Sequence, residues 1–334
     1  MAAPWRGACM GTTMQRRILL AGLAGALLAR PALAQAWAPS RQVTLVLGFP
    51  PGGASDAALR IIQPHLQAAL GQTVVIDNRA GAGGNLGALA VARSAPDGTT
   101  IGSANMGTLA VNPALVRNMG FEVSELAPVS MIFNAVNVLY VPANRPWRSV
   151  AELVAAAKAR PETLNYGTGG VGSPGHLSGI LLDHIAGTRT VPVPYRGGGP
   201  QILAAVAAEH DFGFSPLGTV LSHMQAGTLR ALGVATRTRA PQLSAVPTMI
   251  EAGLPEYEVL NWDGIVVPRA TPAPIRARLG EVIRATLSDP QVAADFARRG
   301  LTPWPTSEEA MEAQLGADAT KWQALIRAAG IQPS

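Results

Sequence analysis

The stretch Val43-Thr-Leu-Val-Leu-Gly-Phe-Pro-Pro-Gly-Gly-Ala-Ser-Asp56 contains the strand, the turn and the helix start that decide the fold. Residues 43–47 are an apolar run of strand length, residues 49–56 form a turn rich in glycine and proline, and residues 57–70 are helical up to a stop at Gly71. Pro64 is expected to kink or split this helix because it lacks a backbone N–H. A strand, a turn and a helix in this order are typical of a parallel βαβ unit.

The same order recurs along the chain. Further strands are predicted at 73–76, 99–103, 135–141, 164–166, 191–194, 212–214, 229–235 and 260–267, and further helices at 85–94, 150–159, 176–186, 201–208 and from Pro274 to Ala329. This alternation predicts an α/β protein in which mainly parallel sheets are flanked by helices.

The strand–loop–helix rhythm restarts after residue 140, which predicts two lobes. Residues 35–139 and 259–334 are expected to form lobe 1, and residues 140–258 lobe 2. Two crossings between α/β lobes make a hinge, and a hinge makes a cleft that can close on a ligand.

The first 34 residues have the pattern of a signal peptide. Arg16 and Arg17 precede an apolar run over residues 18–29, and Ala32-Leu33-Ala34 has the small-residue pattern of a cleavage site. This apolar run is shorter than the roughly 20 residues that a membrane-spanning helix needs. We therefore expect export to the periplasm with cleavage near Ala34, by the general or the twin-arginine route; an uncleaved anchor is the alternative.

Removal of this segment changes the charge of the chain. Four of its 26 Lys and Arg residues lie in residues 1–34, which leaves 22 basic and 21 acidic residues. No basic stripe with interleaved aromatic residues is present, so a nucleic-acid partner is not expected. Cys9 is the only cysteine and also lies in the removed segment, so the mature protein has neither a disulfide nor thiol chemistry.

Four glycine-rich loops lead from predicted strands into helices, at residues 49–56, 79–85, 167–175 and 196–200. Ligands of open α/β sheets bind at the carboxyl ends of the strands, where such loops lie. Each helix N-terminus offers unpaired N–H groups and the positive end of a dipole, and glycine lets the backbone approach the ligand closely. Together the four loops predict a binding site for an anion that needs few charged side chains.

The patterns of common enzyme and cofactor sites are missing. Gly167-x-Gly169-x-x-Gly172 has the letters of a dinucleotide fingerprint, but no acidic residue follows about 20 positions later to hold a ribose. G-x-S-x-G, H-E-x-x-H and the phosphate-binding G-K-[ST] loop are absent, and the five histidines lack the spacing of metal ligands. We therefore expect no cofactor, no metal and no catalytic residue.

Single residues of the four loops have both structural and ligand-binding interpretations. Asp56 lies in a first helical turn, where the dipole favours any acid, or it accepts a hydrogen bond from a ligand. Ser55 and Asn85 are candidate N-caps that can also face a ligand. His176 is unusual at a helix start, which favours a binding role. Arg196 suits a carboxylate as a planar fork or forms a surface ion pair.

Several blocks of sequence, taken together, resemble the solute-binding proteins of tripartite tricarboxylate transporters, a family of periplasmic receptors. The blocks occur in the family's order between about Val43 and Ile331. They are the first quoted stretch with Arg60, Leu70–Arg79, Gly81–Gly87, Ala95–Gly98, Asn165–Gly167 with His176-Leu177, Pro194–Gly198, Pro247–Gly253 and Trp262.

The resemblance implies a two-lobe periplasmic-binding-protein fold of the Venus flytrap kind, in which the first two loops hold a carboxylate, partly through waters. Three positions depart from the family pattern: Arg196 stands where lysine is common, Ser173-Pro174-Gly175 precedes the histidine, and Asp263 follows the tryptophan where an aromatic residue is frequent. If it lines the cleft, Asp263 repels a second carboxylate or receives an amine; otherwise it is a hydrogen-bonding hinge residue. The predicted ligand-binding set is Gly53, Ala54, Ser55, Asp56, Gly84, Asn85, Asn105, Gly169, Gly172, Ser173, His176, Tyr195, Arg196, Gly197, Ser215 and Asp263.

The sequence thus predicts a monomeric, non-enzymatic receptor that closes on a small organic carboxylate and presents it to integral membrane transporter subunits. One alternative is a ligand sensor for a membrane signalling partner. Another is a secreted hydrolase or lyase that uses His176 with Ser173 or Asp263.

Overall fold

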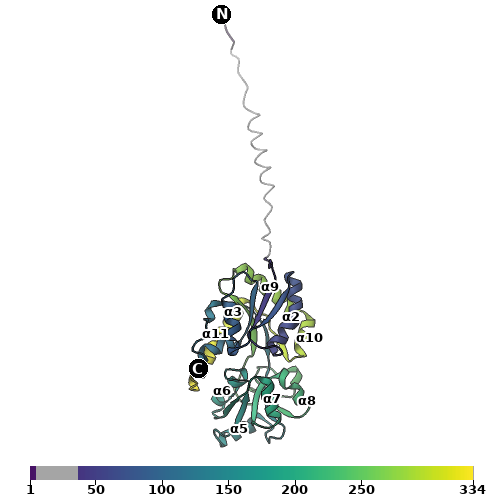
Figure 1. The fold of residues 1–334 in the computed structure, drawn as a ribbon, viewed down its shortest axis with the longest axis vertical. Helices are drawn as coiled ribbons and strands as arrows, with labels where there is room; N and C mark the ends of the chain where they lie inside the picture. Colours follow the sequence, from purple (N-terminus) through teal and green to yellow (C-terminus); the bar gives the residue numbers. More distant parts are fainter. Residues whose placement is uncertain (5–36, 334) are drawn as a thin grey trace. The chain divides into compact units, whose positions relative to one another are not determined.

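The computed structural model describes residues 1–4 and 37–333, so the predicted signal peptide lies almost wholly outside the described residues. The chain divides into Met1–Trp37 and Ala38–Ser334, and the second unit contains the fold. In it, two β-sheets are flanked by helices (Figure 1). This confirms the predicted two-lobe α/β class.

The first lobe is built on a six-stranded sheet in the order β11-β4-β10-β3-β1-β2. Its strands are β1 (Val43–Leu47), β2 (Val74–Asn78), β3 (Thr100–Asn105), β4 (Leu126–Ala135), β10 (Trp262–Pro268) and β11 (Leu301–Pro303). Its helices are α2 (Ala54–Leu70), α3 (Asn85–Ala92), α4 (Asn112–Leu115), α9 (Ala273–Leu287), α10 (Pro290–Ala297) and α11 (Glu308–Ala328).

The second lobe has a five-stranded sheet in the order β7-β6-β8-β5-β9. Its strands are β5 (Asn137–Pro142), β6 (Asn165–Thr168), β7 (Val191–Pro194), β8 (Phe212–Pro216) and β9 (Leu229–Val234). Its helices are α5 (Val150–Ala159), α6 (Pro174–Ala186), α7 (Gly198–Val206) and α8 (Leu217–Gln225).

Both sheets are mixed, which corrects the expectation of mainly parallel sheets. β1 runs parallel to β2 and β3, and β6 runs parallel to β7 and β8. β10 is antiparallel to β3 and β4, and β5 is antiparallel to β8 and β9. The reason is the route of the chain: β4 takes it out of the first sheet and β10 brings it back, so these two strands run in opposite directions.

The chain passes between the sheets at Val136 and returns through residues 235–261, so the predicted lobe boundary at residues 139 and 140 falls inside β5. The two crossings are hydrogen-bonded to each other: Ala135 N–H donates to Asn261 O at 2.9 Å and Ala235 N–H donates to Asn137 O at 2.8 Å. The connection between the lobes is therefore a pair of extended segments that are held side by side.

Two local predictions about helices are wrong. α2 runs through Pro64 without a break; this proline lies on the exposed face, where solvent can hydrate the carbonyl that it leaves unpaired. The C-terminal region is not one helix, because Asp289 caps α10 ahead of Pro290 and the short strand β11 follows.

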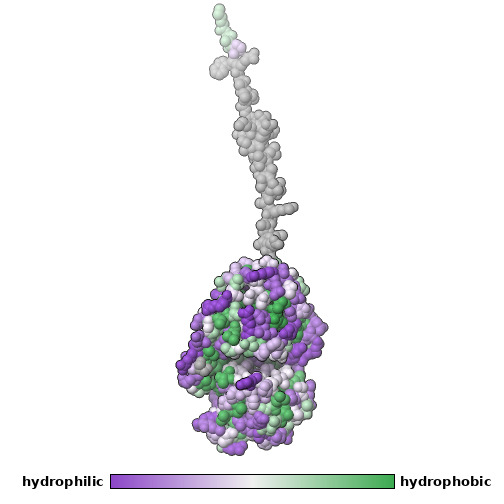
Figure 2. Space-filling view, viewed as in Figure 1, coloured by the Kyte–Doolittle hydropathy of each residue, from purple (hydrophilic) through white to green (hydrophobic). Residues whose placement is uncertain are grey.

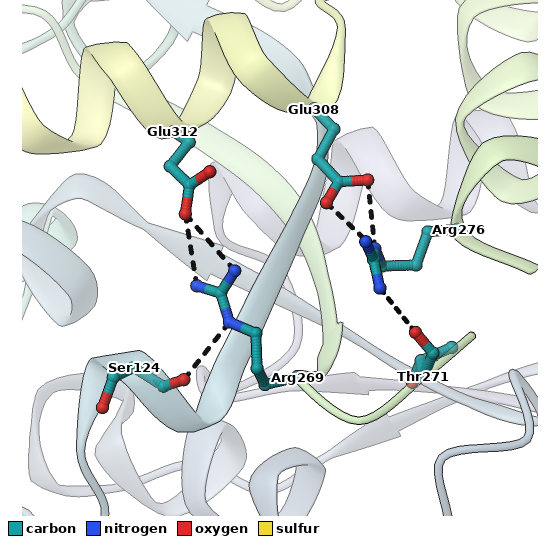
Figure 3. A network of polar contacts seen from close by, with 6 residues as sticks. All are labelled: Ser124, Arg269, Thr271, Arg276, Glu308 and Glu312. Carbon is teal, nitrogen blue, oxygen red and sulfur yellow. Dashed lines mark hydrogen bonds and ion pairs between the residues drawn. The ribbon is translucent and has the colours of Figure 1, made fainter. Parts of the chain in front are cut away.

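Ion pairs hold the start of α11 on the first lobe (Figure 3). Arg276 Nε donates to both carboxylate oxygens of Glu308, at 2.9 and 3.1 Å, and its Nη1 donates to Thr271 O. Arg269 bridges Glu312 and the Ser124 carbonyl. Within residues 37–333, no helix combines the length and apolar character needed to cross a membrane.

Candidate functional site

The loops selected from the sequence lie at one edge of each sheet. β1, β2 and β3 are parallel, so their carboxyl ends meet at the same edge, and β10 begins there with Asp263 opposite Asn105. In the second sheet the parallel strands β6, β7 and β8 also end at a common edge. Val136 links the end of β4 to the start of β5, so these two edges are neighbours. The space-filling view shows a hollow between the lobes (Figure 2).

Glycines let the first two loops pack backbone against backbone. A Cβ atom on Gly48 would lie 2.5 Å from Gly84 O, and a Cβ on Gly84 would overlap Thr108 Oγ1. Gly84 also has φ +95°, a conformation that other residues rarely adopt. The close packing of the two loops therefore requires glycine at these positions, whether or not a ligand requires it too.

Three of the helices at the facing edges begin without a capping side chain, whereas Ser173 caps α6 at the same edge. α2, α3 and α7 follow Gly53, Gly84 and Gly197, none of which can cap. By contrast, the helices with a side-chain cap are α5, α6, α10 and α11, which use Ser149, Ser173, Asp289 and Ser307. The first N–H groups of α2 and α7 therefore remain for a bound anion. α3 differs, because it continues a 3-10 turn at Ala82–Gly84 and its Asn85 N–H donates to Ala82 O.

Buried polar atoms without a partner accompany these helix starts. Asn85 Nδ2, Ser215 Oγ and Asp263 Oδ2 have no hydrogen-bond partner within residues 37–333. The three residues are at most 2 % exposed. Buried polar groups almost always have a partner. Four other such atoms occur in the described chain: Asn137 Oδ1, Arg145 Nε, Thr271 Oγ1 and Trp322 Nε1. Asn85, Ser215 and Asp263 are distinguished by lying together at the facing edges. All three belong to the predicted ligand-binding set.

Asp56 belongs to the internal structure of the first loop. Both of its carboxylate oxygens accept hydrogen bonds: Oδ2 from Gly52 N at 3.0 Å and Arg60 Nε at 2.9 Å, and Oδ1 from Arg60 Nη2 and Asn78 Nδ2. Burial opposes ionisation, but these hydrogen bonds outweigh it and hold the pKa of Asp56 below its usual value. Asp56 therefore fixes the loop from which Gly53, Ala54 and Ser55 project.

Asp263 has a different environment. It is 1 % exposed, and its Oδ1 accepts a hydrogen bond from Ser103 Oγ at 2.5 Å. The Ser55 hydroxyl and the Gly264 N–H also interact with the carboxyl group. Burial raises the pKa of Asp263 above its usual value, because no basic side chain offsets the loss of hydration. The neighbouring Asn105 uses its Oδ1 within the protein, since it accepts from the Thr108 backbone and hydroxyl.

His176 closes the start of α6. Its Nδ1 accepts from Gly172 N at 3.1 Å, and its own N–H donates to the capping Ser173 Oγ. Burial lowers the pKa of His176, so the ring is neutral and carries its proton on Nε2. The ring also lines a cavity of about 680 Å³ that is shared by α6 and the end of α11. Ser173 and His176 thus shape the third loop.

The fourth loop contains an exposed cation. Arg196 forms no ion pair with any residue that the structure describes, and Gly197, with φ +103°, has open space where a side chain would be. Tyr195 is held by its hydroxyl against His210 Nδ1 at 3.4 Å. Gly169 approaches Gly197, since a Cβ at Gly169 would lie 3.6 Å from the Gly197 carbonyl carbon.

The lobes touch on both sides of the hollow. On one side a Cβ at Gly172 would lie 3.0 Å from Leu115 Cδ1, and on the other a Cβ at Gly218 would overlap Arg299 O. Beside the second contact, Gly53 and Ala54 face Pro216 and Thr219 across a cavity of about 290 Å³. The second contact lies beside the connection between the lobes, since Leu217 N–H donates to Val136 O.

Sequence reasoning missed the support beneath the second-lobe loops. His210 lies between the hydroxyl groups of Tyr140 and Tyr195, and Gln201 Nε2 donates to Tyr140 Oη and to two carbonyls, Gly167 O and Phe214 O. No spacing rule links these residues: Tyr140 lies in β5, Gln201 in α7, and Tyr195 and His210 in loops. Within the described part of the chain, no group of three or more His, Cys, Asp or Glu could hold a metal ion.

Comparison with known proteins identifies the family. The model of the tripartite tricarboxylate transporter family receptor matches residues 58–331, so the chain belongs to this family. A protein of Pseudomonas sp. strain P51 from the tcbD–tcbE intergenic region is 36 % identical over 93 % of this chain and 94 % of its own length.

Solved structures agree with this assignment. Rpa4515 of R. palustris, solved with adipate, has a TM-score of 0.81 at 35 % identity and covers 89 % of this chain and 99 % of its own. MatC from Rhodopseudomonas palustris, solved with malate, has a TM-score of 0.76 at 28 % identity and covers 86 % and 99 %. The chain thus has the fold of the periplasmic solute receptors.

Proposed function

We propose that this protein is a periplasmic receptor that closes on a small organic carboxylate and delivers it to the integral membrane subunits of a tripartite transporter. The observation that carries the proposal is the pair of helices, α2 and α7, that start after glycine from facing lobes, at edges where Asn85, Ser215 and Asp263 bury unpartnered polar atoms. Helix N-termini bind an anion, and neutral side chains then orient it.

The relatives support a carboxylate as the ligand. Adipate and malate, the molecules named with two of the similar structures, are both dicarboxylates. Arg196 adds an unpaired guanidinium at the fourth loop, where it can approach a carboxylate from the second lobe.

The internal bonds of Ser173 and His176 weigh against the hydrolase alternative. A nucleophilic serine needs a base that accepts its proton. Here Ser173 Oγ accepts from the His176 backbone, and His176 Nδ1 accepts from Gly172 N. Neither atom is arranged as a nucleophile–base pair, which is why we propose a receptor and not an enzyme.

The experiment is to express the full chain in a bacterium, recover it from the periplasm, and determine its mass and its melting temperature. We expect a mass that corresponds to cleavage after Ala34. In a screen of mono-, di- and tricarboxylates, amino acids and aromatic acids, the correct ligand at about 100 times its Kd should add about 2.7 kcal/mol to the free energy of unfolding. This should appear as a dose-dependent rise of several degrees.

Recovery of the ligand unchanged after incubation completes the test. A ligand that is consumed would support the enzyme alternative, and a screen in which no acid raises the melting temperature would refute the receptor proposal. A full-length mass in the periplasmic fraction would contradict the predicted cleavage but would leave the receptor proposal intact.

A further inference from the structure

Asp263 is a buried acid that lacks a counter-ion. Its Oδ1 accepts from Ser103 Oγ, and the Ser55 hydroxyl and the Gly264 N–H also interact with the carboxyl group. Oδ2 has no well-aligned hydrogen-bond partner within residues 37–333. No Lys, Arg or His of the described chain forms an ion pair with it. Burying a carboxylate without a charged partner is unfavourable even when neutral groups donate to it, so a cationic donor at Oδ2 would stabilise the ionised form of Asp263.

Two other buried aspartates, Asp56 and Asp318, have a cation nearby as well as hydrogen-bond donors. Asp56 has the Arg60 guanidinium and four hydrogen bonds. Asp318 on α11 accepts from Trp262 Nε1 at 2.6 Å and from Gln314 Nε2, with the Lys321 ammonium nearby. The protein therefore supplies partners for its structural aspartates, and Asp263 is the exception.

The position of Asp263 places its missing partner beside the proposed anion site. It stands at the start of β10, opposite Asn105, and its neighbour Ser55 lies in the first turn of α2. A ligand carboxylate at the N-terminus of α2 would thus have Asp263 within the length of a small molecule. A second carboxylate there would face another acid, whereas an ammonium group would supply the missing donor.

We infer that the ligand is an amino carboxylate, and that Asp263 selects it by accepting a hydrogen bond from the ligand's protonated amine at Oδ2. This inference rests on the proposed function and narrows the ligand class. Asp263 acts here as a specificity-determining residue, while the helix N-termini bind the carboxylate that all candidate ligands share.

The test compares acids that differ only in the amine, by calorimetric titration of the purified protein. The pairs are alanine with propionate, aspartate with succinate, and glutamate with glutarate, each amino acid as the racemate. In at least one pair we expect the amino acid to bind about 100-fold more tightly. In Asp263→Asn the ratio should fall below about 10-fold, because the substitution keeps the shape and removes the charge.

Asp318→Asn is the matched control, because it neutralises another buried aspartate on the same lobe and should leave the ratio unchanged. Equal or tighter binding of the acids without an amine would overturn the inference, and so would an unchanged ratio in Asp263→Asn. If Asp263→Asn does not fold, the affinities of the wild-type protein for acids with and without an amine decide whether the inference holds. Binding of no carboxylate at all would instead refute the proposed function.

Discussion

At the scale of single residues, the polar side chains around the hollow divide into those whose atoms the protein uses and those whose atoms it leaves unpaired. Asp56, Ser173 and His176 are engaged with neighbouring backbone or side chains. Asn85 Nδ2 and Ser215 Oγ have no partner in the described chain, although both residues are buried. Substitutions of the two kinds should therefore have opposite effects on stability and binding.

Ser215→Ala is expected to weaken ligand binding about 10-fold and to leave the melting temperature of the free protein unchanged or slightly raised. The Oγ atom makes no internal hydrogen bond, so its removal costs the free protein nothing and relieves a buried polar group. Thermal denaturation without ligand and calorimetric titration with the ligand check the two parts.

Ser130→Ala is the matched control. Ser130 is also fully buried, but its Oγ donates to Met131 O and accepts from Thr306 N. This substitution should lower the free energy of unfolding by about 1–3 kcal/mol and leave the affinity unchanged. If Ser215→Ala behaves like Ser130→Ala, then Ser215 has no role in binding.

The sequence could identify the cleft residues by type and loop, but not their partners. By residue type and position, Asp56 is a candidate for ligand binding. Only its contacts in the structure show that Arg60, Asn78 and Gly52 already donate to its oxygens. Arg60 follows Asp56 at the spacing of an ion pair on a helix, so this one contact was readable from the sequence. The contact with Asn78 depends on the packing of β2 beside β1 and has no local pattern.

At the scale of elements, the sequence predicts strands that are bounded by turn residues. It does not predict strands that depend on pairing with distant segments. β1, β7 and α5 match their predicted ranges, because each is bounded by turn or capping residues. β4 and β11 were missed. Both are antiparallel partners in the middle or at the edge of the first sheet, and β11 has three residues, too few for any periodicity.

The support beneath the second-lobe loops makes stability depend on pH. His210 is fully buried, with its ring between the hydroxyl groups of Tyr140 and Tyr195, and burial lowers its pKa to about 4. In the unfolded chain its pKa is about 6.5, so between these values the unfolded chain binds a proton that the folded chain does not. Stability is therefore lost as the pH falls from about 6.5 to about 4.

We expect His210→Gln to remove up to about 3 kcal/mol of the difference in unfolding free energy between pH 7.5 and pH 4.5. Urea denaturation at the two pH values measures this difference. His176 is also buried with a lowered pKa, so the variant should keep a weaker slope of the same sign. His184→Gln, at an exposed position on α6, is the control. An unchanged slope in His210→Gln would mean that the imidazole does not remain neutral in the folded protein.

At the scale of the whole molecule, glycines allow the backbones of the two lobes to approach each other closely. Gly218, in the first turn of α8, packs directly on the Arg299 carbonyl of the first lobe, so a Cβ atom there would overlap this oxygen. The contact lies beside the cavity that Gly53 and Thr219 line. A side chain at residue 218 would therefore hold the lobes apart without changing the loops that begin α2, α3 and α7.

Gly218→Ala should weaken ligand binding by 10-fold or more and lower the melting temperature of the free protein, because its Cβ atom would overlap the Arg299 backbone carbonyl. A ligand that prefers the closed state loses affinity in proportion to the loss of that state. Calorimetric titration gives the affinity, and solution X-ray scattering with saturating ligand should show a larger radius of gyration than the wild type. Gly316→Ala is the control, because a Cβ there meets only open space on α11. Wild-type affinity in Gly218→Ala would show that this contact does not limit closure.

The two adjacent crossings have a consequence for how such receptors can diversify. Residues 137–258 leave the first lobe at Val136 and return to Asn261, whose carbonyl accepts a hydrogen bond from Ala135. The second lobe is therefore an uninterrupted cassette with its two ends side by side. Exchange of this cassette between family members would bring the loops of one second lobe together with those of another first lobe. A new ligand preference can therefore arise in one genetic step.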